Sequence, residues 1–368
     1  MIRKILLALS LTVFVLCAAE AKINPLMPKQ NAVVSQHKKP VEDFLAEASD
    51  KRVKLMRDED FRKKLSKTAR APEPVLFVWT ADSNDGFILE LSEDKDFKNP
   101  ISVSSNGNSA SVPNLKMARK YFWRVKTPDG SDVSKTRTFT TADAAPRMMT
   151  VAGVRNVRDL GGRKGLNGKR VRQNLIFRGA GLNANSKDGI KAGANTIKPE
   201  GVKYMKDVLK IKTDLDLRSK KEVADMSGSP LGKDVNWINI SSSGYAGSFE
   251  KDGKERFVKM FRLFCDEKNY PFYVHCIGGA DRTGSLAFIL NAILGVSADE
   301  LEKDWQATIF ADRNMDFVAE PRYFKLVEGF DSFGSKDEPY SVKVERYLKS
   351  GGISDAEIAK FRSIMLEK

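Results

Sequence analysis

The chain has 368 residues, of which 62 are Lys or Arg and 48 are Asp or Glu, so its formal net charge at pH 7 is +14. That length is too great for one small domain and predicts several. The chain has only two histidines, His37 and His275, and no Gly-x4-Gly-Lys-[Ser/Thr] loop. A His-rich metal site is therefore excluded, and an ATP-dependent kinase or ATPase is not expected. We expect neither a metal ion nor a cofactor.

The first 21 residues have the pattern of an export signal. Arg3 and Lys4 precede an apolar run at residues 5–16, and a small-x-small cleavage site, Ala-Glu-Ala, ends at residue 21. The apolar run is shorter than the ~20 residues that cross a bilayer. No later stretch is long and apolar enough either, so no transmembrane span is expected. Cleavage after residue 21 gives a mature chain that starts at Lys22 and is periplasmic or secreted.

Residues 22–71 are polar and charged, with apolar positions scattered among them. They predict one or two charged helices that act as a linker.

The pattern changes at residues 72–142 to short β-branched and aromatic runs separated by Asp-Gly and Asn-Gly turns. The runs predict strands at residues 75–79, 87–91, 101–104, 121–125 and 136–140. With Trp79 expected to be buried and a corner formed by Leu115, Tyr121 and Trp123, they predict an all-β sandwich. The segment resembles a fibronectin type III module and carries no catalytic constellation. Binding of a surface or protein ligand, spacing and stabilisation of the fold all remain open for it.

Residues 145–368 alternate apolar strands with helices and predict a three-layer α/β domain around a central sheet. Within it, residues 270–275 predict a short buried strand and residues 283–294 an apolar helix. Between them, residues 275–284 read His-Cys-Ile-Gly-Gly-Ala-Asp-Arg-Thr-Gly, an H-C-x5-R-T-G pattern. The run therefore lies on a strand–loop–helix turn, where loop N–H groups and a helix N-terminus converge on an anion.

The residue types in this loop indicate phosphate chemistry. Cys276 is a nucleophile only as the thiolate, and a free Cys has a pKa of about 8.5. Loop amides, the helix dipole and Arg282 favour negative charge, so we expect the pKa of Cys276 to lie well below neutrality. Arg282 can hold two phosphoryl oxygens in a fork that Lys cannot form. Gly278 and Gly279 let the backbone curl inward without a Cβ clash. The expected reaction is attack of the sulfur on phosphorus, protonation of the leaving oxygen, and hydrolysis of the cysteinyl-phosphate.

The loop resembles the H-C-x5-R-[ST] signature of the cysteine-dependent protein tyrosine phosphatase superfamily. Other runs resemble its atypical bacterial tyrosine/dual-specificity branch. They are Asn-Val-Arg-Asp-Leu-Gly-Gly at 156–162, Phe-Arg-Gly-Ala at 177–180, and Asp-Leu-Arg-Ser at 216–219 followed by Glu222. Four motifs in the right order make the resemblance specific, and it covers roughly the C-terminal 60% of the chain.

The resemblance implies a role for each residue of the loop. Cys276 matches the nucleophile and Arg282 the phosphate clamp. His275 matches the residue that keeps the pKa of the thiol low, and Thr283 matches the hydroxyl that contacts the sulfur and eases breakdown of the phosphoenzyme. The phosphate-binding backbone would be that of Ile277, Gly278, Gly279 and Ala280.

Two residues are candidates for the general acid. Relatives with C-x-x-G-x-D-R place an acidic Asp inside the loop, which matches Asp281. The alternative is Asp252, in a mostly polar segment at 244–253 that we expect to form a flexible cover over the site.

The substrate expected from the loop is phosphotyrosine in a protein. Some relatives act on phosphoinositides, but Ala280 stands where a Lys is commoner, and this removes one positive charge. A phosphoinositide or inositol phosphate phosphatase on the same scaffold remains the alternative, followed by a non-catalytic binding protein. The basic surface fits anionic partners. Nucleic acid is not expected, because no basic-aromatic motif is present.

The upstream motifs contain further charged residues. Arg158 and Asp159 fit a substrate mouth and a structural role equally well. Asp216 and Arg218 are expected to brace the loop as a buried ion pair, with Arg178 in the same network, because buried charges need partners.

After signal cleavage two cysteines remain, Cys265 and Cys276. A disulfide between them could protect or switch off the nucleophile in an oxidising compartment. The favoured interpretation is that Cys265 belongs to the core of an amphipathic helix. Its neighbours at helical spacing are Phe257, Met260, Phe261 and Phe264.

Overall fold

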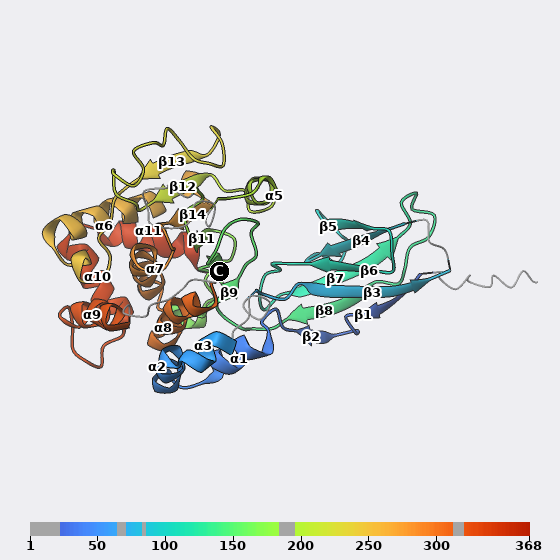
Figure 1. The fold of residues 1–368 in the computed structure, drawn as a ribbon, viewed down its shortest axis with the longest axis horizontal. Coiled ribbons are helices and arrows are strands. Elements are labelled where there is room, and N and C mark those ends of the chain that lie inside the picture. The colour runs from blue at the N-terminus through green and yellow to red at the C-terminus, as the bar shows by residue number, and fades with distance from the viewer. Residues whose placement is uncertain (1–22, 65–70, 83–85, 184–195, 312–319) are drawn as a thin grey trace, which may run out of the picture.

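The computed structural model describes residues 23–64, 71–82, 86–183, 196–311 and 320–368. Figure 1 shows an elongated molecule in which a β-rich region lies beside an α/β region. The expected export signal at 1–21 lies outside the described residues. Among the described helices, none is long and apolar enough to cross a membrane.

Two sheets make up the β-rich region. One has the strand order β1-β3-β6 and the other β2-β8-β7-β4-β5. The strands are β1 (Ile23–Met27), β2 (Ala32–Val34), β3 (Val75–Ala81), β4 (Phe87–Ser92), β5 (Ile101–Ser105), β6 (Ser109–Val112), β7 (Lys120–Lys126) and β8 (Arg137–Thr141). Each of the five expected runs overlaps one strand, and β1, β2 and β6 were not expected.

Side chains from both sheets share one core. Trp79 of β3 and Trp123 of β7 are 1% and 0% exposed, and Phe77 meets Trp123 edge-on with ring centroids 5.1 Å apart. The hydroxyl of Tyr121 accepts the Lys116 N–H at 3.1 Å, which ties the start of β7 to the turn before it.

Within the segment at 22–71, the described residues 23–64 do not form the expected linker. β1 pairs antiparallel with β3, and β2 pairs parallel with β8, so both strands belong to the β-rich region. Three short helices follow, α1 (Lys39–Ala46), α2 (Ser49–Arg57) and α3 (Glu59–Lys64). In Figure 1 they lie along the α/β region, beside α8.

The packing of α1 and α2 explains the difference. Val41, Phe44 and Leu45 stand at positions i, i+3 and i+4, which places them on one helix face that is buried in the α/β core. Phe44 meets Phe310 edge-on with ring centroids 5.3 Å apart. These helices therefore belong to the α/β region and do not act as a spacer.

The α/β region is built on a six-stranded sheet with the order β13-β12-β14-β11-β10-β9. Its strands are β9 (Arg147–Met148), β10 (Arg158–Asp159), β11 (Ile176–Gly179), β12 (Thr213–Asp216), β13 (Asn236–Asn239) and β14 (Phe272–His275). The four strands from β13 to β11 are parallel, and β10 and β9 add antiparallel pairs at one edge. The carboxyl ends of the parallel strands share one edge, where ligands bind in open α/β sheets.

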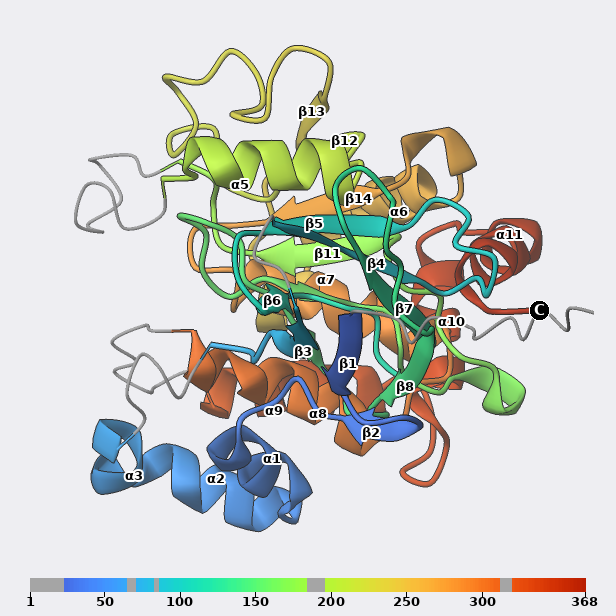
Figure 2. The same ribbon diagram turned by 90° about the vertical axis from the view of Figure 1, so that its right-hand side faces the viewer.

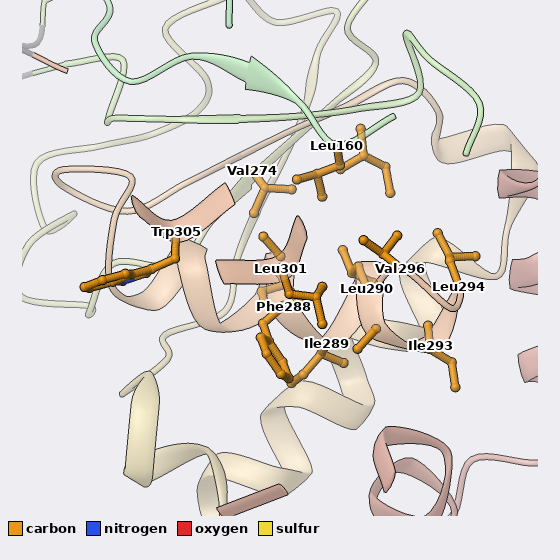
Figure 3. Packing of buried hydrophobic residues seen from close by; sticks show 14 of the residues in the cluster. Leu160, Val274, Phe288, Ile289, Leu290, Ile293, Leu294, Val296, Leu301 and Trp305 are labelled. Atoms are coloured by element: carbon orange, nitrogen blue, oxygen red, sulfur yellow. The ribbon is translucent and has the colours of Figure 1, made fainter. Parts of the chain in front are cut away.

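Helices cover both faces of this sheet, as Figure 2 shows. One face carries α5 (Pro199–Lys203) and the π-helical turn η3 (Tyr204–Val208). The other carries α6 (Lys251–Phe264), α7 (Arg282–Ile293), α8 (Ala298–Gln306), α9 (Glu320–Asp331), α10 (Tyr340–Ser350) and α11 (Asp355–Met365). Tyr273 packs on the first layer, whereas Val274 packs on the second, beside Leu160 and the apolar side chains of α7 (Figure 3). The expected three-layer α/β domain is confirmed.

The two regions meet through specific polar contacts. Arg147 donates Nε to Leu115 O at 3.0 Å and Nη2 to Asn114 O at 2.5 Å. The Gln173 amide exchanges two 2.9 Å hydrogen bonds with the backbone of Met117. The β-rich region is therefore docked on the α/β region and not merely tethered to it.

Candidate active site

The H-C-x5-R-T-G run places residues 276–281 in a tight loop between the end of β14 and the start of α7. The carbonyl oxygens of this loop accept hydrogen bonds from groups outside its curve. The donors are the His275 ring to Cys276 O (3.1 Å), Gly181 N–H to Ile277 O (3.0 Å), the Asn156 amide to Gly278 O (3.0 Å), Arg178 to Gly279 O (2.6 Å) and to Ala280 O (3.5 Å), and Ser285 N–H to Asp281 O (2.9 Å). A trans peptide places its N–H opposite its C=O. The loop N–H groups therefore turn inward, toward the space beside the sulfur.

One glycine in the loop is required by the backbone. Gly279 has φ +67, and a Cβ there would collide with the carbonyl group of Gly179 on β11. A larger residue would push the loop away from the sheet edge.

The Cys276 sulfur is arranged to be a thiolate. Its side chain is 1% exposed, and burial alone would raise its pKa. Arg282 and hydrogen bonds from the hydroxyl and N–H of Thr283 outweigh burial, and the pKa of Cys276 lies below its ordinary value. The Thr283 hydroxyl has no other hydrogen-bond partner among the described residues. The structure thus brings Cys276, Arg282 and Thr283 together.

Arg282 is held in place by Glu222 through two parallel bonds. Nη1 donates to Oε2 at 2.7 Å and Nη2 donates to Oε1 at 2.9 Å. Burial would raise the pKa of Glu222, but Arg282 and the Ser219 N–H lower it to about 2, so Glu222 is an anion at neutral pH. A guanidinium has five N–H donors. Two point at Glu222, and a longer bond runs from Nη1 to Leu217 O at 3.5 Å. The remaining N–H groups can bind the oxygens of a phosphate.

His275 is fully buried between acceptors. Its Nε2 lies 2.9 Å from Oδ1 of Asp214, although off-line for a hydrogen bond, and its Nδ1 lies 3.1 Å from Cys276 O. Both ring nitrogens face acceptors, so the ring holds both protons. Burial would lower the pKa of His275, but the carboxylates of Asp216 and Asp214 raise it to about 9. An imidazolium beside Cys276 favours the thiolate, as the resemblance implies.

Asp281 stands at the last position of the loop, half-buried, just before α7. Its side chain makes no capping bond to the helix. Instead Oδ1 accepts the Tyr245 hydroxyl at 2.7 Å, and that hydroxyl accepts Nε1–H of Trp305 at 3.2 Å. The carboxylate is therefore directed by side chains from two other elements.

A model of the tyrosine phosphatase family matches residues 149–367. The chain belongs to the tyrosine phosphatase family. It is therefore a hydrolase that acts on phosphate esters. Among solved structures it is similar to the core catalytic domain of PP-IP phosphatase SIW14 from S. cerevisiae in complex with citrate. The identity is 14% and the TM-score 0.28, over 44% of this chain and 90% of that chain. No curated protein matches the chain.

In this member of the tyrosine phosphatase family, Arg158 and Asp159 do not lie at a substrate mouth. Their side chains are buried, and Asp159 accepts Nη1–H of Arg147 and the N–H of Asn174, both at 2.7 Å. Arg158 points at Asp304, and burial lowers its pKa to about 9. The substrate-mouth prediction was wrong because these charges find their partners inside the fold.

Asp304 on α8 joins three buried arginines. Its Oδ1 lies 3.2 Å from Arg158 Nε and 3.0 Å from Arg163 Nη2, and its Oδ2 pairs with Arg178 Nη1. Burial would raise its pKa, but the three guanidinium groups hold it well below its ordinary value. Because Arg178 also binds Gly279 O, this cluster fixes one side of the phosphate loop.

A second buried ion pair lies at the end of β12. Arg218 donates Nε to Oδ1 of Asp216 at 2.9 Å and Nη2 to Oδ2 at 2.7 Å, and both side chains are buried. This geometry agrees with the bracing expected for Asp216 and Arg218.

The segment at 244–253 is not the flexible cover that the sequence predicted. It contains the 3-10 turn η4 (Tyr245–Ser248) and the start of α6, and both end residues of η4 are buried. Asp252 lies on the first turn of α6, 78% exposed and 3.9 Å from Arg256. Asp281, by contrast, lies within the phosphate loop itself.

Cys265 caps the end of α6, as expected for a core helix, and burial raises its pKa to about 12. The preceding residue, Phe264, contacts Phe272 at the amino end of β14, with ring centroids 4.4 Å apart. Cys276 follows the carboxyl end of the same strand, about 13 Å further along. A disulfide needs Cα atoms within about 7 Å. Both cysteines are free in this fold, which does not form the Cys265–Cys276 disulfide.

Sequence reasoning assigned no role to Glu222, Tyr245 or Asp304. Glu222 belonged to a quoted motif, and its place three residues after Ser219 was the available signal. Tyr245 and Asp304 reach the site only through folding. In the sequence Asp304 is one charge among several on a helix.

Proposed function

We propose that this chain is an exported protein tyrosine phosphatase that works through a cysteinyl-phosphate on Cys276. The observation that carries the proposal is the place of a buried cysteine at the start of the β14–α7 loop, beside Arg282 and Thr283, which lower its pKa. A structural cysteine in apolar surroundings behaves in the opposite way, as the raised pKa of Cys265 illustrates.

The first step forms the S–P bond and breaks the bond from phosphorus to the leaving oxygen. The Cys276 thiolate attacks in line, while Arg282 and the loop N–H groups hold the other oxygens as their charge grows. Asp281, protonated, gives its proton to the leaving oxygen. The products of this step are the free alcohol or phenol and the phosphoenzyme.

The second step returns the enzyme. The Asp281 carboxylate takes a proton from a water molecule, which attacks phosphorus and breaks the S–P bond. The sulfur leaves as a thiolate, and the hydroxyl of Thr283 stabilises it. Inorganic phosphate departs, and Asp281 again holds the proton for the next turnover.

Phosphotyrosine is the substrate we favour over multiply phosphorylated inositol. Such a headgroup needs a cation for each additional phosphate. The loop residue before Asp281 is Ala280, which is 4% exposed and supplies none. A phosphotyrosine side chain carries a single phosphate, so it needs no second cationic residue.

The experiment is the initial rate on a phosphotyrosine peptide, a phosphoserine peptide, a phosphoinositide and inositol hexakisphosphate, with Cys276→Ser as control. We expect turnover of phosphotyrosine that the variant loses. Turnover of the inositol compounds alone would replace the proposal with the inositol phosphate alternative. No turnover of any substrate would favour a binding protein.

We also propose that residues 1–21 are a cleaved export signal and that the β-rich region is a fibronectin type III-like module. The two sheets around one core and the Tyr121 corner support the second statement. N-terminal sequencing of the protein recovered from cell fractions tests export. The expected mature protein begins at Lys22 outside the cytoplasm, and an intact N-terminus in the cytosol would contradict it.

A further inference from the structure

Tyr245 is tied to Asp281 by a closed ring of hydrogen bonds. Its hydroxyl donates to Asp281 Oδ1 at 2.7 Å, and its N–H donates to Ser285 Oγ at 2.7 Å. The Ser285 hydroxyl in turn donates to the carbonyl oxygen of Asp281 at 3.1 Å. The ring therefore fixes Tyr245 to both the side chain and the main chain of the same residue.

The backbone at this point adopts a conformation that needs support. Gly244 has φ +68 and Tyr245 has φ +48, two consecutive residues in the left-handed region. A non-glycine residue holds such a φ only where its surroundings impose it, often at functional sites. Gly244 also lies so close to α7 that a Cβ would be 3.1 Å from Arg282 Cα. This turn thus packs closely against Arg282, the first residue of α7.

Trp305 sets the direction of the hydrogen bond to Asp281. The indole Nε1–H can only donate, and it points at the Tyr245 oxygen at 3.2 Å. The phenol then has one proton, and an acceptor, Asp281 Oδ1, lies 2.7 Å away. Oδ1 is therefore the accepting oxygen of the carboxyl group.

We propose that Tyr245, oriented by Trp305, is the positioning residue for the general acid Asp281: it holds Oδ1 as acceptor, so the transferable proton is carried by Oδ2. The inference rests on the proposed function, because it assumes that Asp281 protonates the leaving oxygen. Tyr245 itself neither gives nor takes a proton in the reaction. It acts by fixing the rotation of the carboxyl group before substrate binds.

The test compares kcat and KM of wild type and Tyr245→Phe on two aryl phosphates. Phenyl phosphate has a poor leaving group that needs a proton, and 4-nitrophenyl phosphate has a good one that does not. We expect kcat on phenyl phosphate to fall about tenfold, a part of the 10²–10⁴-fold that general acids supply. On 4-nitrophenyl phosphate the fall should be below about twofold, with KM unchanged on both.

Tyr347→Phe is the matched control. It removes another buried tyrosine hydroxyl, which donates to Ser248 O at 2.6 Å on the same turn η4 but does not touch Asp281. We expect it to leave the ratio of the two rates unchanged. A parallel change in the two Tyr→Phe variants would overturn the proposal, since packing of η4 would then explain both.

A double-mutant cycle gives the second readout. In an Asp281→Asn background, Tyr245→Phe should cause no further loss, because the group that it positions is already disabled. Independent losses that multiply would overturn the proposal. If Tyr245→Phe does not fold by circular dichroism, Trp305→Phe, which removes the donor to Tyr245, serves in the same cycle with a smaller loss of the same kind.

The design separates this inference from the proposed function. If wild type hydrolyses neither aryl phosphate in a Cys276-dependent way, the phosphatase mechanism fails and the inference with it. If wild type is active and Asp281→Asn spares phenyl phosphate, the acid is elsewhere and Tyr245 has nothing to position. If Asp281→Asn is selective and Tyr245→Phe is not, only the positioning role is wrong.

Discussion

Nε2 of His275 lies 2.9 Å from Oδ1 of Asp214, with both side chains fully buried. On its far side Asp214 accepts the Ser229 hydroxyl at 2.6 Å. Burying the imidazolium without the carboxylate, or the carboxylate without the imidazolium, would be costly. The pair therefore connects the charged ring of His275, just before Cys276, to a carboxylate on the neighbouring strand β12.

This relationship predicts how stability changes with pH. The pKa of His275 rises from 6.5 to about 9 on folding, so its stabilisation is present in full below pH 6.5 and is lost as the pH rises toward 9. The free energy of unfolding should fall over that range by on the order of 3 kcal/mol. We suggest measuring it by urea unfolding in a Cys276→Ser background, because the lowered pKa of Cys276 adds a slope of opposite sign. Adding Asp214→Asn should make the curve shallower, because Asp216 and Asp214 together raise the pKa of His275 and only Asp216 would remain. Parallel curves would show that Asp214 does not contribute to this rise.

Glu222→Gln should lower kcat about tenfold, because Arg282 loses the anion that aims its fork at the phosphate. Thermal stability should change little, since the pair is partly exposed. Glu338→Gln is the control: Glu338 makes the same two-bond contact with Arg346 on the surface. Equal kinetic effects of the two variants would show that Glu222 has no specific role in the site.

The two cysteines should differ in reactivity. At pH 7 iodoacetamide should modify Cys276 and spare Cys265, whose pKa burial raises to about 12. Arg282→Ala should shift the reaction of Cys276 to higher pH, because Arg282 opposes the effect of burial on its pKa. Mass spectrometry of the alkylated peptides measures both. Comparable labelling of both thiols at pH 7 would contradict the thiolate assignment.

Peroxide treatment tests whether the Cys265–Cys276 disulfide can form. Recovery of the oxidised enzyme by thiol reductants should be the same for wild type and Cys265→Ser, because Cys265 follows Phe264, which packs on the amino end of β14, whereas Cys276 follows its carboxyl end. A Cys265–Cys276 peptide in a non-reducing digest would require a different fold around this strand.

Asp304→Asn should reduce the free energy of unfolding by about 3–5 kcal/mol, since it removes the anion that three buried guanidinium groups share. Asp207→Asn, which breaks an exposed i,i+4 pair with Lys203, should change the free energy of unfolding far less, because solvent screens that pair. Denaturant unfolding of both variants measures the difference. Similar values would show that the cluster around Asp304 does not hold the fold.

Much of the catalytic loop could be predicted because its parts are contiguous. Cys276 and Arg282 are six positions apart, between a strand and a helix, so the short loop that joins these two elements brings them together. Local sequence also revealed five of the eight described strands of the β-rich region, since period-2 patterns and Gly turns are local signals. The same local reading failed for residues 22–71, where three apolar positions on one face of α1 were counted as scattered.

The sequence by itself therefore determined the candidate nucleophile, the candidate phosphate clamp, the α/β class of the C-terminal region and the β-rich character of the region before it. Only the tertiary structure decided which charged side chains lie in the candidate site and which are buried in the interior of the fold. Arg158 and Arg282 are both arginines in quoted motifs, yet Arg158 is buried with Asp304, whereas Arg282 is partly exposed and pairs with Glu222. It also decided that Tyr245, 36 residues before Asp281, would touch it. The physical reason is that an ion pair or a hydrogen bond depends on distance in space, whereas a sequence motif reports only distance along the chain.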